Sequence, residues 1–74
     1  MTPERREVLE LLASLSELNP DMRMGQWLSL FAMMARDSSV ESIYDVEDQE
    51  LIPVMRGFLA KRQAIAVEQM ATAQ

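Results

Sequence analysis

The chain has no cysteine and no histidine among its 74 residues. Their absence excludes disulfides, thiolate or imidazole metal ligands, cysteine nucleophiles and every catalytic pair that depends on histidine. Glycine, proline and aromatic residues are scarce, and the chain is rich instead in alanine, leucine, methionine, glutamate and other good helix formers. Because few residues suit strands, the composition predicts an all-α protein.

Basic residues are missing from the middle of the chain. Between Arg36 and Arg56 the sequence has six acidic residues and no basic one, whereas the remainder is nearly neutral. The net charge of −5 therefore comes from one central segment. Nucleic acids are bound by a basic stripe or face, so this charge pattern argues against nucleic-acid binding.

Long hydrophobic runs are absent too. The longest, Trp27 to Ala35 with Ser29 inside it, is much shorter than the roughly 20 residues of a membrane-spanning helix. The first residues of the chain are charged, and no apolar segment typical of a secretory signal follows them. We expect a cytoplasmic protein with no membrane partner.

The length predicts a single helical domain over residues 1–74, with the last residues, about 69–74, frayed. A chain this short buries only about 60% of the surface that its unfolded form exposes. Without disulfides or a metal to compensate, helix packing and self-association are the remaining sources of stability.

The first helix is predicted over residues 3–18. Thr2 suits the N-cap position, and Pro3 suits the first helical position. The helix should end at Asn19, because a residue that precedes proline disfavours the α conformation. Apolar residues recur at helical spacing and form one core-facing stripe, made of Val8, Leu11, Leu12, Leu15 and Leu18.

A second helix is predicted over residues 21–36, with Asp21 as its N-cap. Opposite its apolar side, three small residues would allow another helix to pack closely: Gly25, Ser29 and Ala32. Arg23 projects onto the apolar side. Its side chain either extends past the apolar surface into solvent or forms an ion pair with Asp45 or Asp48.

The third helix is predicted over residues 46–70, with a kink near Pro53 because proline lacks the N–H that the helix needs. Alternatively, its start shifts to about Glu50. Asp45 and Asp48 have the spacing of a capping box. Residues 37–45 are expected to form a loop or one short turn. Short connections between the segments predict a compact bundle of three antiparallel helices.

Four acidic residues gather at the start of the third helix: Asp45, Glu47, Asp48 and Glu50. The simplest interpretation is that they stabilise the positive end of the helix dipole. A surface for a protein partner is the second. A Ca²⁺ or Mg²⁺ site is the least favoured, because the segment lacks the glycine and the spacing of an EF-hand loop. We predict no metal, no cofactor and no catalytic residue, since nothing marks a pocket or a substrate-orienting group.

Two short motifs lie within residues 19–51. One is Arg23-Met24-Gly25-Gln26, and the other is Asp45-Val46-Glu47-Asp48-Gln49-Glu50-Leu51. They resemble the Arg-x-Gly-Gln motif and the later Asp-x-Glu-Asp-x-Glu-Leu motif of a group of short bacterial proteins with no assigned activity. The resemblance implies a bacterial origin and no catalysis. Pro53 and the alanine-rich tail after Lys61 depart from the pattern.

The sequence therefore predicts a small, non-enzymatic module for protein–protein interaction. Self-association as a homodimer, through the second helix or the C-terminal tail, is the leading hypothesis because the chain is small and rich in apolar residues. The alternative is an acidic inhibitor, or an immunity-type protein, whose central acids cover a basic site on a partner such as a nuclease.

Overall fold

Four helices form the structure in the part of the chain that it describes. This computed structural model describes residues 1–39 and 41–72, with side chains as far as Gln69. In chain order the helices are α1 (Pro3–Leu18), α2 (Met24–Ala35), α3 (Glu41–Asp45) and α4 (Asp48–Thr72), and no strand occurs within these ranges. The all-α prediction is confirmed. The predicted three helices are joined by a short fourth one, α3, within the segment expected to be a loop or a turn.

α1 occupies the predicted range. The Thr2 hydroxyl oxygen accepts a hydrogen bond from the Arg5 backbone N–H at 3.1 Å, and Pro3 is the first helical residue. At the other end the Asn19 N–H donates to the Leu15 carbonyl at 3.0 Å. Pro20 then prevents the helix from continuing. Signals between near neighbours in the sequence therefore set both ends of this helix.

α2 begins three residues later than predicted, at Met24, so Asp21 is not its N-cap. The preceding residues form a turn in which the Met22 N–H donates to the Asn19 carbonyl at 3.2 Å. Arg23 takes the N-cap position, and its backbone N–H donates to the Gln26 side-chain oxygen at 2.8 Å. A glutamine at the third helical position that reaches back to the cap outweighs the capping preference of Asp21.

The side chain of Asp37 stabilises a turn in the connection between α2 and α3. Its Oδ1 accepts hydrogen bonds from the Ser39 backbone N–H at 2.8 Å and from the Ser42 hydroxyl at 2.6 Å. An aspartate that bonds to the backbone two residues later mimics a turn. Ser42 is thereby buried inside α3.

α4 begins at Asp48, two residues after the predicted start, and Asp45 and Asp48 do not form the expected capping box. The Glu47 N–H donates instead to the Glu50 Oε1 at 3.2 Å. Glutamate has the extra methylene group that lets a side chain in the first turn reach back to the cap. The helix runs through Pro53 without interruption. The start at Asp48 therefore lies two residues before the alternative start at about Glu50, and the kink near Pro53 stays a prediction.

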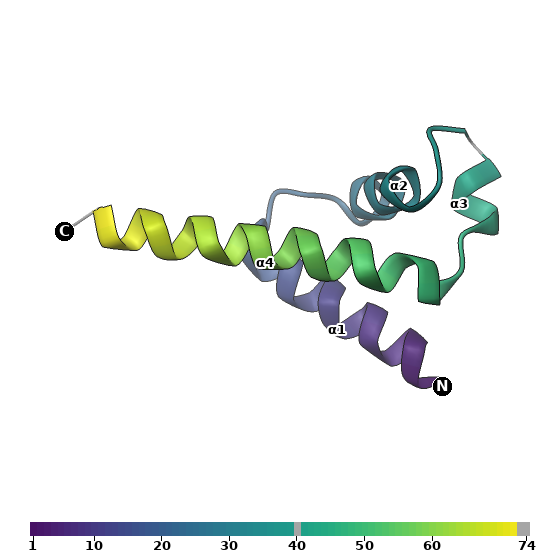
Figure 1. Ribbon diagram of the computed structural model, residues 1–74, viewed down its shortest axis with the longest axis horizontal. Helices are drawn as coiled ribbons and strands as arrows, with labels where there is room; N and C mark the ends of the chain where they lie inside the picture. The colour runs from purple at the N-terminus through teal and green to yellow at the C-terminus, as the bar shows by residue number, and fades with distance from the viewer. Residues whose placement is uncertain (40, 73–74) are drawn as a thin grey trace.

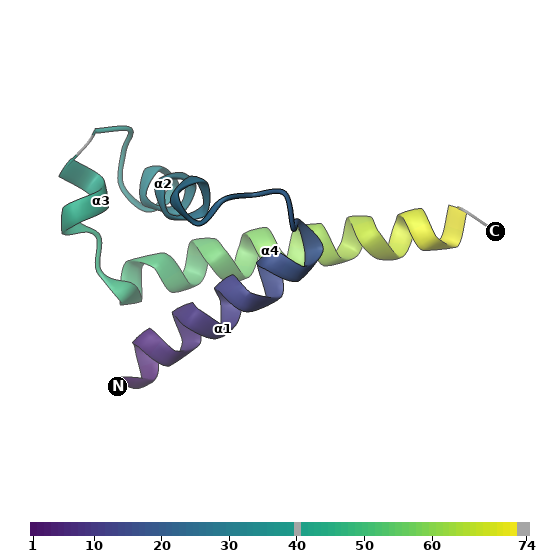
Figure 2. The same ribbon diagram turned by 180° about the vertical axis from the view of Figure 1, so that it is seen from behind.

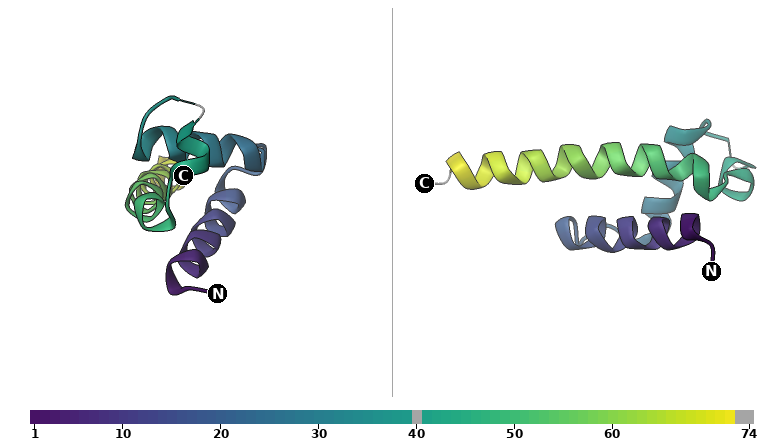
Figure 3. Two further views of the ribbon diagram at one scale, coloured as in Figure 1. Left: turned by 90° about the vertical axis from the view of Figure 1, so that its right-hand side faces the viewer. Right: turned by 60° about the horizontal axis from the view of Figure 1, so that its bottom comes forward.

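The long helix α4 is the axis of the molecule. α1 lies along it and points the same way, whereas α2 crosses α4 and is seen almost end-on (Figures 1 and 2). α1 and α2 both pack mainly on α4, and α3 packs beside α2 (Figure 3). The arrangement differs from the predicted antiparallel bundle, in which α2 would run alongside the other two helices. The turn at residues 19–23 redirects the chain before α2 begins.

The core lies where α1, α2 and α4 meet. Its buried members are Val8, Leu12, Leu15, Trp27, Phe31, Leu51 and Met55. Trp27 stacks on Phe31 with ring centroids 5.7 Å apart, and Phe58 meets Phe31 edge-on at 5.5 Å. The guanidinium carbon of Arg62 lies 5.0 Å from the Phe58 ring centroid. This cation–π contact explains how a charge occupies the core side of α4.

The second half of α4 projects beyond the other helices (Figure 1). Between Ala60 and Gln69 every side chain is exposed except the half-buried Ala66. The molecule measures 45 × 27 × 19 Å with a radius of gyration of 13.4 Å, whereas a compact domain of this length has a value of about 11 Å. We call the projecting residues 60–72 the arm. Residues 73 and 74, the end of the segment predicted to fray, lie outside the described residues.

Candidate interaction surfaces

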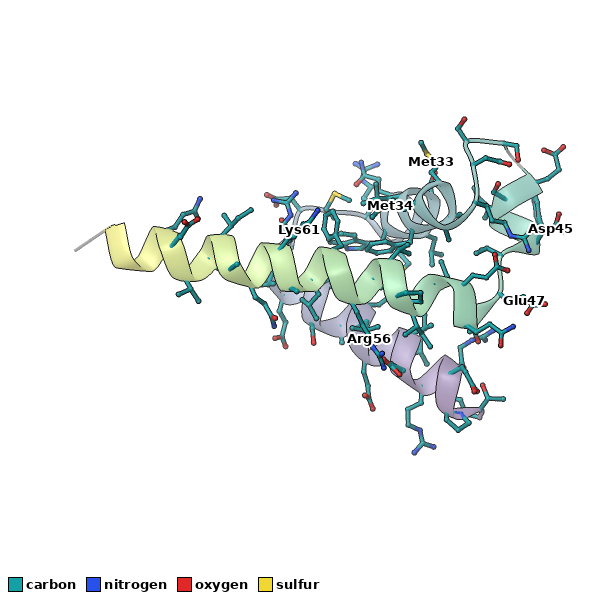
Figure 4. The ribbon with its side chains drawn as sticks, in the orientation of Figure 1. Met33, Met34, Asp45, Glu47, Arg56 and Lys61 are labelled. Carbon is teal, nitrogen blue, oxygen red and sulfur yellow. The ribbon has the colours of Figure 1, made fainter. Side chains whose placement is uncertain are left out.

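Two ion pairs tie the start of α4 to the other helices. Arg5 in α1 pairs with Asp48 at 2.8 Å. Arg36, just after α2, donates to both carboxylate oxygens of Glu50, each at 2.9 Å. A third ion pair joins Arg56 of α4 to Glu7 of α1 (Figure 4). In this pair the basic residue lies on α4 and the acidic residue on α1. Two of the four acids predicted to bind a partner, Asp48 and Glu50, are therefore engaged within the chain.

The other two acids stay at the surface. Asp45 and Glu47 are exposed at the corner between α3 and α4 (Figure 4). Glu47 accepts a hydrogen bond from the Gln49 amide at 2.9 Å. Together with the exposed Glu41, these residues form the part of the acidic segment that a partner can reach.

The predicted ion pair of Arg23 is wrong. In the described part of the chain, Arg23 pairs with neither Asp45 nor Asp48. Because the starts of α1 and α4 lie side by side, Asp48 pairs with Arg5 and not with Arg23. Arg23 is exposed at the start of α2, which agrees with the alternative in which its head group lies in solvent.

Hydrogen bonds lower the pKa values of two acids near the ends of α2 and α4. The pKa of Asp37 falls to about 2, chiefly because Ser39 and Ser42 donate hydrogen bonds to its carboxylate. The hydrogen bonds from Arg36 lower the pKa of Glu50, and Glu50 in turn raises the pKa of Arg36. These groups stay charged at neutral pH, so they suit structural roles rather than general acid–base catalysis.

An apolar groove lies between α1 and α2, over the start of α4. It measures about 590 Å³, and the Arg5–Asp48 ion pair lies at one end. Its floor includes the buried Val8, Leu12 and Leu51, and its walls include Leu9, Met24 and Leu28, which are 46%, 53% and 39% exposed. We call it the α1–α2 groove. Sequence patterning missed it, because the groove results from the way α2 crosses α4.

A second apolar patch covers the outside of α2 and α3. Met33 lies on the side of α2 away from α4 (Figure 4). The exposed members of the patch are Met33, Met34, Ile43 and Tyr44. Met22 is half-buried against the core. The methionines therefore divide between core filling and exposed surface.

The three small residues predicted to pack closely behave differently from one another. Ala32 is fully buried and Ser29 is half-buried. Gly25 is exposed, and nothing lies within 4 Å of the position that a Cβ would occupy. The prediction is therefore wrong at Gly25, because no other helix covers the first turn of α2.

Within residues 1–39 and 41–72, no three acidic side chains gather in an arrangement that could hold a metal ion. None of the helices in these ranges combines the length and the hydrophobicity needed to cross a bilayer.

Comparison with known proteins assigns no family or activity. No protein-family model matches the chain, no curated protein is significantly similar to it, and no solved structure significantly resembles its fold. The resemblance of residues 19–51 to short bacterial proteins stays a prediction.

Proposed function

We propose that the protein is a non-enzymatic module for protein–protein interaction that associates with itself. The observation that carries this proposal is the exposed surface of 5438 Å². A folded monomer of 8.4 kDa is expected to expose about 4,600 Å². The surplus of about 800 Å² equals the area that one partner contributes to a protein–protein interface of standard size.

The chemical character of the exposed surface supports the same proposal. The α1–α2 groove, the patch on α2 and α3, and the arm all present large apolar side chains. Contiguous exposed apolar surface on a soluble protein usually marks an interaction site. Two-fold homodimers are the commonest oligomers of soluble proteins, so a second copy is the partner of first choice.

The acidic inhibitor is a second proposal with narrower support. Glu41, Asp45 and Glu47 give one end of the molecule an exposed negative surface that would attract a basic partner. Asp48 and Glu50 are already paired with arginines of the same chain. A basic partner would have to compete with these arginines, so the surface available to it is smaller than the sequence predicted.

Thermal unfolding at different protein concentrations tests self-association. A dimer that dissociates on unfolding has a melting temperature that rises with concentration. We expect such a rise at both low and high salt, because salt screens an apolar interface little. A melting temperature that is independent of concentration would contradict the proposal. A concentration dependence that disappears at high salt would show that charges hold the copies together, which would contradict an apolar interface but not self-association.

A further inference from the structure

The α1–α2 groove continues into an acidic hollow at the starts of α1 and α4. This hollow measures about 370 Å³ and shares Arg5 and Asp48 with the groove. Its other charged lining residues are Glu4 and Glu47, both of them exposed. We call the hollow the acidic mouth. The apolar groove and the acidic mouth form one continuous surface.

The acidic mouth keeps a negative charge after its internal ion pair is counted. Three acidic residues and one arginine line it, which leaves an excess of two negative charges. The positive ends of the α1 and α4 dipoles contribute about half a charge each, so about one negative charge remains. Asp45 is exposed at the same corner as Glu47 (Figure 4) and adds to it. The mouth therefore attracts a positively charged group.

The rest of the groove suits apolar side chains. Beyond Arg5 and Asp48, the described residues that line it carry no charge. Along α1 its wall runs from Arg5 to Ser16, which is about 16 Å or three helical turns. An occupant that matches the whole surface is apolar over about this length and basic at one end.

The groove favours a helix over an extended peptide. An extended peptide has backbone N–H and C=O groups that need partners, whereas a helix pairs its own. Apart from the two charged residues at the mouth, Ser16 supplies the polar side chain of the described lining. A helix laid between α1 and α2 would place side chains at i, i+4 and i+7 in the groove. Met24, on the wall, has a flexible side chain that adapts to different partners.

We propose that the α1–α2 groove binds a basic amphipathic helix of a different protein, whose apolar side chains fill the groove and whose lysine or arginine residues lie at the acidic mouth. The charge complementarity at the mouth identifies the partner as basic. The inference goes beyond self-association, because it assigns a surface for a second kind of protein. It holds for one chain or for a pair of chains that leaves the groove open.

A synthetic helix tests this binding on the full chain. The probe has leucines at i, i+4 and i+7 on an alanine and glutamine background, with lysines in both end turns so that either direction is allowed. Fluorescence anisotropy of the labelled probe measures its affinity. We expect binding that weakens as salt rises without vanishing, because salt screens the mouth and not the apolar contacts. A control peptide with glutamates in place of the lysines should bind about tenfold more weakly.

Substitutions in the groove locate the bound helix. Leu9 is 46% exposed on the groove wall and is not part of the buried core, so Leu9→Gln should leave the fold intact. We expect Leu9→Gln to weaken binding about tenfold. Met33→Gln is the matched control, since Met33 is 49% exposed in the patch on α2 and α3. It should leave the affinity unchanged.

Substitutions of single acids test the mouth in the same way. We expect Glu47→Gln to weaken binding about threefold at low salt and much less at high salt. Glu10→Gln removes the same charge from an exposed position that lines a different hollow on α1. It should have little effect at either salt concentration.

The other outcomes would overturn the inference. Equal affinity for the lysine and glutamate peptides would show that the mouth selects no charge. A loss of binding with Met33→Gln and not with Leu9→Gln would place the helix on the patch instead. A dimer that dissociates as the peptide binds would show that a second copy covers the groove, which overturns the inference and leaves self-association intact. A monomer that binds the peptide as expected would support the inference and contradict self-association.

Discussion

Asp37 shows how much one side chain contributes to the order of a connection. It lies directly after α2, and its carboxylate holds both the backbone of Ser39 and the hydroxyl of Ser42. Ser42 is buried, so its hydroxyl needs this partner. The charge of Asp37 strengthens the hydrogen bonds that position α3.

Protonation of Asp37 should therefore weaken the fold in acid. Its pKa of about 2 in the folded protein lies below the ordinary value of 3.8, so its contribution is present above about pH 4 and is lost as the pH falls towards 2. We expect Asp37→Asn to lower the melting temperature at pH 7 and to match the unmodified protein near pH 2. Thermal melts between pH 2 and 7 measure this, with Asp21→Asn as the control. A difference that does not change with pH would contradict the account.

Replacing Phe31 tests how much a single core residue contributes to stability. It is almost completely buried and lies in contact with the rings of Trp27 and Phe58. Removing such a ring costs about 3–5 kcal/mol of unfolding free energy. We expect Phe31→Ala to unfold the chain in large part and to shift the fluorescence of Trp27, the single tryptophan, towards that of exposed indole. Met33→Ala, on the exposed side of the same helix, should change neither by much.

At the scale of helices, local signals set the ends of some elements but not their arrangement. The ends of α1 depend on Thr2, Pro3 and Pro20, which act on immediate neighbours, so they were predictable. The starts of α2 and α4 depend on Gln26 and Glu50, which reach back three residues to compete with better-known capping residues. The crossing of α2 over α4 depends on contacts between distant residues, and no periodicity within one segment encodes it. The α1–α2 groove was therefore not predictable either.

The ion pairs between helices were mispredicted for the same reason. One of the two interpretations of the sequence paired Arg23 with Asp45 or Asp48, but the arginines that pair with acids of α4 in the structure are Arg5 and Arg36. Charge patterns show that acids and bases are available for pairing. The packing of α1 beside α4 decides which of them meet.

Double-mutant cycles can measure this choice of partners. We expect Arg36→Ala and Glu50→Ala to lower stability by less in combination than the sum of their separate effects, because each removes the same bidentate contact. The cycle of Arg23→Ala with Asp45→Ala should be additive, since these residues form no ion pair in the described chain. Melting temperatures at low salt give both results. Coupling in the second cycle and none in the first would contradict the arrangement of α2.

At the scale of the whole molecule, the chain exposes more surface than its mass requires. The core occupies the first half of α4, where three helices meet, and the arm extends beyond it (Figure 1). The exposed acids at the corner between α3 and α4, the α1–α2 groove and the arm are made of different residues. A small chain without disulfides gains stability if a second copy covers such a surface. Self-association would therefore serve stability as well as function.

Sedimentation equilibrium of the purified chain, at low and at high salt, measures self-association without unfolding the protein. We expect a mass twice that of the 8.4 kDa chain at both salt concentrations, and a shift towards the single-chain mass when Val67→Glu places a charge on the arm. Asp21→Ala, at an exposed polar position before α2, should leave the dimer intact. A mass of 8.4 kDa at every concentration and at both salt concentrations would contradict self-association. It would favour the alternative proposal of an acidic inhibitor.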